Sequence, residues 1–456
     1  MNDRLPRDRS YDLFAVDQFE APSTRDVLPE DKDAFRRYLR MLATDATIYG
    51  IPAVYEYAQL YEQAVDVTSP TFTGFNTFLH QRDLTTPEFT AFKTPNVDTL
   101  YSNAWLDLTG GPLLIEVPPI PDRYYTLHFV DMYGNASNLS SRTVRSGGGT
   151  FHVAPSTWEG EVPAGATPFR VATPYMWILM RILVKNRSDT ELVRRLQDAV
   201  VITPSCPRQE VPFVAARFDE VQVRADRFFP ALDWVLRNNG HPAQEEAYVH
   251  RFRALGLGGA EPFNPATAGP EAMGSIEDGF AEAMAIIARS RGQVGRRVAT
   301  GWKTGTAGEM GFNYLQRAIQ NFVGTGGNIA AEKKFFVTFD DGDGRPLHGG
   351  QARYSITFES LPPVNGHWSL TAYPQATGLL YPNEIDRYAI AATTEGLRAG
   401  EGGTVEIVVQ HDRPSDVANW LPVPDGPFYL DIRMWEPRPE ALDGTWIPPR
   451  IDTRAR

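Results

Sequence analysis

Arg123-Tyr-Tyr-Thr-Leu-His-Phe-Val-Asp-Met-Tyr133 is part of the densest run of functional side chains in this chain, and it lies between Thr94-Pro-Asn-Val-Asp-Thr-Leu-Tyr101 and Ser141-Arg-Thr143. Tyrosines, acids and an arginine alternate here with apolar residues at the two-residue spacing of a β-strand. One face of a sheet would therefore carry Tyr125, Asp131 and Tyr133 while the other packs a core. Polar groups of such different acidity, held on rigid strands, suit a small-molecule site better than a solvated surface.

The bulk composition bounds the class of protein. At 456 residues the chain is long for a single core, so we expect two or three domains. Its 38 glycines and 36 prolines favour many short strands joined by turns. The net charge of −12, without a cluster of basic residues, argues against nucleic acid and anionic membranes as partners.

Cysteine content and hydropathy indicate the compartment. The single cysteine, Cys206, excludes an intrachain disulfide and a cysteine-based zinc site. Residues 1–10 carry no apolar core after their charges, so we expect no secretory signal. No apolar run approaches the roughly 20 residues of a membrane span. We therefore expect a cytoplasmic protein.

The pattern along the chain is helices, then strands, then helices, then strands. We predict a loose arm over residues 1–28, helices plus a first β-sandwich over 29–186, a helical segment over 187–328 and a second β-sandwich over 329–456. Gly50 and Pro52 divide the first helical stretch, which predicts two helices there. Since strands do not alternate with helices, we expect an α+β, mostly β fold with two antiparallel, jelly-roll-like sandwiches rather than a doubly wound sheet.

The first candidate site comes from the opening motifs. Its proposed catalytic residues are Asp98, Asp131, Tyr101 and Tyr125, and its proposed substrate-binding residues include Asn96, Tyr133, Arg142 and Arg181. Two carboxylates in one cleft can divide acid and base roles, and a tyrosine beside a guanidinium can donate a proton. The alternative is structural: Asn96 and Asp98 would cap a turn, and the tyrosines would be half-buried strand residues.

Two further stretches supply candidate binding residues. Trp420 could stack on a ring and Asn419 orient a polar group, or Trp420 could simply plug one end of a sandwich. Arg387, next to Tyr388, would recognise an anion if it points inward, or pair with Glu384 or Asp386 on the surface.

Metal and cofactor motifs are not evident. The eight histidines form no short ligand motif, and His128 and His367, both expected in strands, are more commonly satisfied core residues. Asp340-Asp-Gly-Asp-Gly344 lacks the glutamate of a calcium loop and is interpreted as a hairpin turn. We predict no metal site and no redox cofactor, with a divalent cation left open at the carboxylates.

Several of these motifs resemble known families. Asn96-Val-Asp-Thr-Leu-Tyr101, Arg123-Tyr-Tyr125, Asp131-Met-Tyr-Gly-Asn135 and Arg142-Thr143 are similar to the signature of the DUF1254 domain. Trp368-Ser-Leu-Thr-Ala-Tyr373, Arg387-Tyr388, Asn419-Trp-Leu-Pro422 and Asp443-Gly-Thr-Trp446 are similar to the DUF1214 domain that usually accompanies it. The resemblance implies tandem jelly-roll-like sandwiches with helical segments. It implies no catalytic role, because the family names record an unknown function.

Two functional hypotheses follow. The first is a cytoplasmic enzyme of lyase, dehydratase, isomerase or hydrolase type that acts by acid-base chemistry on a small organic molecule. The second is a non-catalytic protein that binds a carbohydrate or another small molecule through Trp420 and the tyrosines. A scaffold or homo-oligomer subunit is a third. The mixture of Asp, Tyr and Arg in one segment favours the enzyme.

Overall fold

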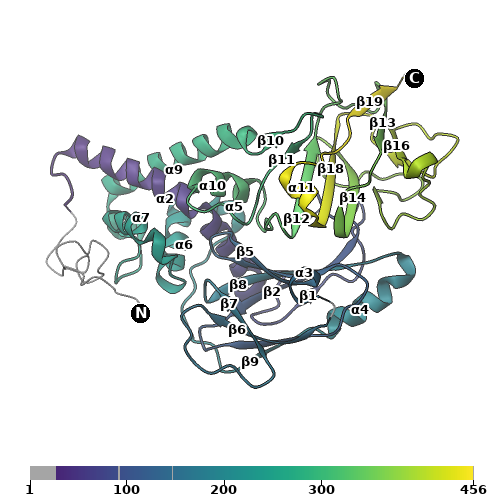
Figure 1. Cartoon of the computed structure of the whole chain (residues 1–456). Coiled ribbons are helices and arrows are strands. Elements are labelled where there is room, and N and C mark those ends of the chain that lie inside the picture. The colour runs from purple at the N-terminus through teal and green to yellow at the C-terminus, as the bar shows by residue number, and fades with distance from the viewer. Residues whose placement is uncertain (1–26, 91–92, 146, 455–456) are drawn as a thin grey trace, which may run out of the picture.

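The computed structural model describes residues 27–90, 93–145 and 147–454, so most of the arm predicted over residues 1–28 lies outside the described part. The architecture is α+β with more strand than helix, as predicted. Four mostly antiparallel sheets form two sandwiches, and the helices gather beside them (Figure 1).

The first sandwich is built from residues 79–204. Its five-stranded sheet has the order β1 (Leu79–His80), β2 (Thr99–Asp107), β8 (Tyr175–Leu183), β4 (Tyr125–Asp131) and β5 (Ala136–Ser140). Its four-stranded sheet has the order β7 (Thr167–Val171), β6 (Gly149–Pro155), β3 (Leu113–Val117) and β9 (Val201–Pro204). Alternate apolar residues such as Leu127, Phe129, Ile178 and Ile115 fill the space between the two sheets.

The second sandwich repeats this plan near the C-terminus. Its six-stranded sheet has the order β10 (Arg296–Arg297), β11 (Lys303–Thr304), β12 (Lys333–Thr338), β18 (Phe428–Pro437), β14 (Val364–Pro374) and β15 (Ala389–Ala391). Its four-stranded sheet has the order β17 (Trp420–Pro422), β16 (Val405–Gln410), β13 (Arg353–Phe358) and β19 (Ile451–Arg454). Leu370, Ile432, Ile356 and Ile407 lie in its core.

Most of the helices form one body around α2. The longer ones are α2 (Lys32–Leu60), α4 (Thr190–Asp198), α6 (Ala225–Asn238), α9 (Pro270–Ser290) and α10 (Tyr314–Val323). The four-residue helices α3 (Ser141–Val144), α5 (Phe218–Val221), α7 (Glu246–Val249) and α8 (Pro265–Ala268), with α11 (Pro439–Asp443), complete the set. Helices α2, α6, α9 and α10 share one apolar core with Trp105 and Trp177 of the five-stranded sheet. Within the described residues no helix is both long and apolar enough to cross a bilayer.

One local prediction is wrong. The stretch expected to form two helices is the single helix α2, with Pro52 inside it. A proline removes one backbone hydrogen bond, but Gly50 and Pro52 are buried in the helical core, and that packing keeps the helix continuous.

The packing of α2 on α9 depends on a glycine. A Cβ atom at Gly279 would lie 2.5 Å from the Arg40 carbonyl oxygen and 2.6 Å from Ala43 Cβ, whereas one at Gly274, in the same helix, would meet nothing within 4 Å. We predict that Gly279→Ala lowers the free energy of unfolding by about 1–3 kcal/mol through overpacking. Gly274→Ala should raise it by up to about 1 kcal/mol through helix propensity. Urea unfolding of the two variants measures both, and equal effects of the two substitutions would contradict the close helix contact.

Candidate functional site

The two sandwiches meet through polar sheet faces. On β14 and β18 the apolar residues, among them Leu370 and Ile432, point into the second sandwich. The alternate residues point the other way, toward β2, β8 and β4 of the first sandwich. They are almost all buried: His367, Ser369, Thr371, Tyr373, Tyr429, Asp431, Arg433 and Trp435. Tyr101, Thr126, His128 and Arg181 face them from the first sandwich. We call this region the inter-sheet site.

Asp98 and His367 bring together the two halves of the chain. Asp98 ends the loop before β2, and its Oδ2 lies 3.4 Å from Nε2 of His367 on β14. Both side chains are buried. Burial alone would raise the pKa of Asp98, but the neighbouring polar side chains of His367 and Ser369 and the charge of Arg433 together lower it. Asp98 is therefore an ionised carboxylate at neutral pH that can orient the imidazole.

Arg433 anchors the loop that carries Asp98. Its guanidinium pairs with Asp431 at 2.9 Å and donates hydrogen bonds to the Tyr373 hydroxyl at 2.8 Å and the Thr94 carbonyl at 2.8 Å. The Tyr373 hydroxyl in turn donates to the Pro95 carbonyl at 2.6 Å. The loop at 94–98 is thus held on the face of the second sandwich.

Arg181 lies between two aromatic rings, one from each sandwich. Its guanidinium carbon is 5.4 Å from the centre of the Tyr101 ring and 5.6 Å from that of Trp435. Nη1 lies 3.2 Å from Nδ1 of His128. The register places Tyr101 directly opposite Arg181 and His367 directly opposite Trp435. The arginine contacts and the Asp98–His367 pair therefore belong to one site.

Lys333 adds a titratable amine. It lies on β12 opposite Trp435, and its Nζ is 5.3 Å from the centre of that ring. Burial and the neighbouring charges of Arg433 and Arg181 lower the pKa of Lys333 to about 7, against the opposing effect of Asp431. An amine with such a pKa is divided between its charged and uncharged forms at neutral pH and can serve as an acid or a base.

Several buried polar atoms in the inter-sheet site have no hydrogen-bond partner among the described residues. They are Asp98 Oδ2, Thr99 Oγ1, His128 Nε2, Arg181 Nε, His367 Nε2, Ser369 Oγ, Asp431 Oδ1 and Trp435 Nε1. Buried donors and acceptors in folded proteins are nearly always satisfied by protein, water or ligand. These atoms are the ones that a small polar molecule would engage.

Glu332 forms the border of the inter-sheet site. Its buried carboxylate accepts hydrogen bonds from Arg142 Nε at 2.9 Å, the Ser140 hydroxyl at 3.0 Å and the Tyr124 hydroxyl at 3.1 Å. All three donors belong to the first sandwich. Arg142, predicted to bind substrate, is therefore engaged in a contact that joins the two sandwiches.

Of the residues predicted from sequence, the structure brings together Asn96, Asp98, Tyr101 and Arg181, with Arg142 at the border. The Asn96 side chain accepts from the backbone amide of Asp98 and shapes the loop. Tyr388 packs beside Tyr373 and Tyr429 at one edge of the inter-sheet site.

Tyr125 and Asp131 lie elsewhere. Tyr125 points into the first sandwich, where its hydroxyl donates to the Arg145 carbonyl at 2.9 Å and burial raises its pKa to about 12. Asp131 pairs in register with Met176, and Met176 with Leu106, so it is at the opposite end of the sheet from Asp98. Eight residues of strand separate them, or about 25 Å. The two carboxylates therefore do not share a cleft, and the expected division of acid and base roles between them is wrong.

Asp131 and Tyr133 belong to a second buried polar cluster, next to the helices. Asp131 accepts from the backbone amides of Tyr133 and Asn135. Tyr133 lies with Tyr49 and Tyr314 around Arg317, which pairs with Glu245 at 3.1 Å. The Asp131 contacts hold the turn after β4, and the Arg317 contacts tie α10 to neighbouring elements, as expected of a structural network.

Arg387, Asn419 and Trp420 lie in the second sandwich and hold its loops together. Arg387 donates to the carbonyls of Val417, Ala418 and Trp420. The Asn419 amide donates to the carbonyls of Arg398 and Glu406, and Trp420 Nε1 donates to Gln410.

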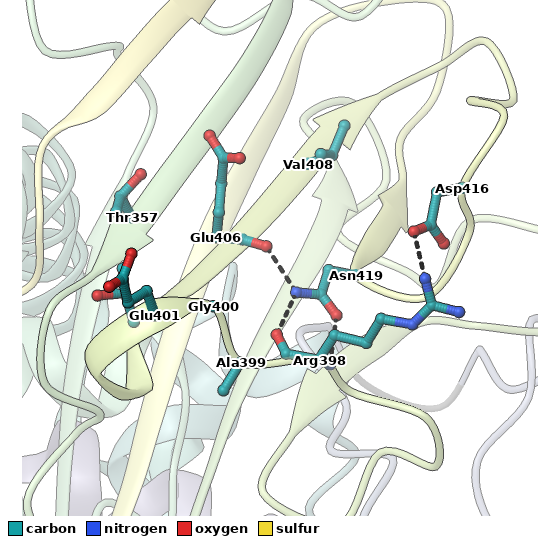
Figure 2. A pocket seen from close by; sticks show the side chains of 10 residues that line it. Thr357, Arg398, Ala399, Gly400, Glu401, Glu406, Val408, Asp416 and Asn419 are labelled. Atoms are coloured by element: carbon teal, nitrogen blue, oxygen red, sulfur yellow. Dashed lines mark hydrogen bonds and ion pairs between the residues drawn. The ribbon is translucent and has the colours of Figure 1, made fainter.

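Figure 2 shows Asn419 at the edge of an open surface hollow of about 650 Å³, where Arg398 pairs with Asp416. The side chains of that ion pair are 72% and 61% exposed. This hollow lacks the buried titratable groups of the inter-sheet site.

The residues that sequence reasoning missed come chiefly from the second sandwich: Lys333, His367, Ser369, Asp431, Arg433 and Trp435, with His128 from the first. One signal for them was present. Polar and apolar residues alternate strictly along His367–Tyr373 and Tyr429–Trp435. No group of three metal-ligating side chains among residues 27–90, 93–145 and 147–454 is arranged to hold a metal ion.

Comparison with known proteins relates this geometry to two domain families. A model of DUF1254, described as a protein of unknown function, matches residues 75–204, and a model of DUF1214, with the same description, matches residues 332–439. Together they match just over half of the chain. The chain belongs to the DUF1254/DUF1214 family. Asp98, Tyr101 and Arg181 lie in the DUF1254 match and Lys333, His367 and Arg433 in the DUF1214 match.

The chain is similar to solved structures. The crystal structure of the VPA0106 protein from Vibrio parahaemolyticus is 24% identical with a TM-score of 0.72, over 91% of this chain and 100% of that one. A putative uncharacterized protein from Burkholderia cenocepacia is 12% identical with a TM-score of 0.43, over 93% of this chain and 90% of that one. No curated protein is matched.

The Glu332 contact yields a prediction on stability. Arg142→Met removes one of three donors to a buried carboxylate, which should lower the free energy of unfolding by about 1–3 kcal/mol. Arg398→Met, which breaks only the exposed pair with Asp416, should cost less than about 1 kcal/mol. Urea unfolding provides the comparison. Equal losses of unfolding free energy in the two variants would show that the Glu332 contact stabilises the fold no more than an exposed ion pair does.

Glu56 gives a prediction on pH dependence. Burial, with Asp131 nearby, raises the pKa of Glu56 above its ordinary value of 4.5, and neither carboxylate oxygen has a partner among the described residues. Because the folded state favours the neutral acid, the wild type should lose stability as pH rises above 4.5. Glu56→Gln, which cannot ionise, should be more stable than the wild type at pH 7 to 8 and lose this advantage toward pH 4.5. Thermal unfolding across pH tests this, with the exposed Glu277→Gln as control; an advantage independent of pH would refute it.

Proposed function

We propose that this protein is an enzyme that transfers protons on a small organic molecule bound in the inter-sheet site. The observation that carries the proposal is the contact of Asp98 with His367, formed by two buried side chains from different sandwiches. Packing alone does not require ionisable side chains at these two positions. Burial of an ionisable pair costs free energy unless its charges are compensated, so such pairs are often found where they serve a function.

The proposed roles follow from the geometry. Asp98, ionised, orients the His367 imidazole, which exchanges a proton with the substrate. The distance of 3.4 Å is longer than a good hydrogen bond, as is common for catalytic pairs before substrate is bound. Lys333, with its pKa near 7, is a second proton-transfer group on the same face. This set suits reactions that remove one proton and deliver another, as lyases, dehydratases, isomerases and hydrolases require.

A substitution at Asp98 tests this function. Purified protein is incubated with pools of small organic metabolites, and products are identified by mass spectrometry. Asp98→Asn keeps the shape of the side chain but removes its charge, so turnover should fall by about 10²- to 10⁴-fold, while the melting temperature changes by only a few degrees. Asp416→Asn, which alters an exposed carboxylate, is the matched control and should retain activity.

Two outcomes would contradict the proposal. Unchanged turnover by Asp98→Asn would exclude this carboxylate from the chemistry. Ligand-induced quenching of tryptophan fluorescence without product formation from any pool would favour a non-catalytic binding protein instead.

A further inference from the structure

We infer that the inter-sheet site binds the carboxylate group of a small organic anion between Arg181 and Lys333. The inference rests on the proposed function, since it names the substrate class of the same site. It is carried by the distribution of charge and by unpartnered polar atoms, independently of the Asp98–His367 contact.

The charge of Arg181 is not paired with a carboxylate among the described residues, since Asp98 lies against His367 and Glu436 accepts a hydrogen bond from Ser141. Arg433 is paired with Asp431, and Glu332 is paired with Arg142. Among the described residues, Arg181 has no carboxylate within ion-pair distance; its polar contact is the neighbouring His128. Burial and the charge of Arg181 hold the pKa of His128 well below its usual range, so this imidazole is neutral. A buried guanidinium without a counter-charge is unfavourable, and a bound anion removes that cost.

The surroundings of Arg181 leave one edge for a ligand. The rings of Tyr101 and Trp435 lie near its guanidinium, and Nη1 is directed to His128. Nε is buried and unpartnered, and so is the indole Nε1 of Trp435. An arginine edge of this kind binds a carboxylate by two parallel hydrogen bonds. The aromatic rings supply apolar contact for the organic part of the molecule.

The amount of charge favours a carboxylate over a phosphate. Arg181 contributes one full positive charge and Lys333 a fraction of one at neutral pH, since its pKa is about 7. A single negative charge matches this, whereas a phosphate group carries nearly two. Lys333 interacts electrostatically with Arg433, Asp431, Arg181 and His128. Other charged or titratable groups of the inter-sheet site and its border are Asp98, Tyr101, Tyr124, Glu332, His367 and Glu436, from both sandwiches.

Direct binding to the intact protein tests the inference. Titration calorimetry at pH 6.5 is carried out with sodium acetate, pyruvate and benzoate, with benzamide as the neutral counterpart of benzoate and with inorganic phosphate. At least one carboxylate should bind, and benzamide should bind about tenfold or more weakly than benzoate, because it cannot pair with a charged donor.

Variants identify the residues responsible. Arg181→Gln should weaken carboxylate binding at least about tenfold, and Arg181→Lys should recover only part of the loss, because lysine lacks the planar edge. Arg398→Gln, which removes an exposed arginine elsewhere, is the matched control and should bind like the wild type. Should Arg181→Gln fail to fold, Lys333→Met serves in its place, since Lys333 is more exposed than Arg181 and methionine keeps its apolar contacts.

The pH dependence gives a second readout. Lys333 loses its charge as pH rises through about 7, so carboxylate affinity of the wild type should fall between pH 6 and 8.5. Lys333→Met should bind more weakly at pH 6 and show a flatter dependence. Absence of binding by all three carboxylates, equal binding of benzamide and benzoate, tighter binding of phosphate or unchanged binding by Arg181→Gln would overturn the inference. Asp98→Asn should still bind the carboxylate. Failure of the proton-transfer proposal would therefore show as unchanged turnover in Asp98→Asn, whereas failure of this inference would show as absent carboxylate binding in the wild type.

Discussion

The structure depends on the burial of two polar sheet faces against each other. Sandwiches normally keep apolar residues inside and present polar residues to water, and both sandwiches of this chain follow that rule internally. Where they meet, however, the outward-facing Arg433, Asp431 and His367 contact the first sandwich instead of solvent. Burial of such groups is stabilising only if their hydrogen bonds are made. The loop at 94–98 accepts a hydrogen bond from Arg433, and this contact determines where the two sandwiches pack against each other.

The same constraint explains why chemistry would concentrate at this contact. Neither sandwich alone encloses Asp98, Lys333 or Arg181, because each needs the other to exclude water from its polar face. Low access to water by itself would raise the pKa of Asp98 and lower that of Lys333. At Asp98 the neighbouring His367, Ser369 and Arg433 outweigh this effect, so the pKa of both groups is lowered. The two matched domains of unknown function therefore each contribute one face of the inter-sheet site.

Sequence patterns predicted the architecture better than the site. Alternation and turn residues located most strands, and the motif at 94–101 pointed to Asn96, Asp98 and Tyr101. The partner of Asp98 was not predictable, because His367 lies far along the chain and nothing local in either segment specifies that two strands from different sandwiches face each other. The strict alternation in β18 was visible, but a polar face ordinarily indicates solvent. Asp131 was misplaced because spacing on one strand says nothing about which end of the sheet carries the site.

Glu332 and Lys333 are consecutive in the chain but differ in their contacts. The Glu332 carboxylate accepts hydrogen bonds from Tyr124, Ser140 and Arg142, whereas the Lys333 amine faces the Trp435 ring. Any movement that separates the two sandwiches must break the hydrogen bonds of the Glu332 carboxylate and expose the Lys333 amine to water at the same time. The lysine would then regain ordinary basicity and become a poor nucleophile toward acylating reagents near neutrality. The rate at which Lys333 is acylated near neutral pH therefore reports whether the two sandwiches are in contact.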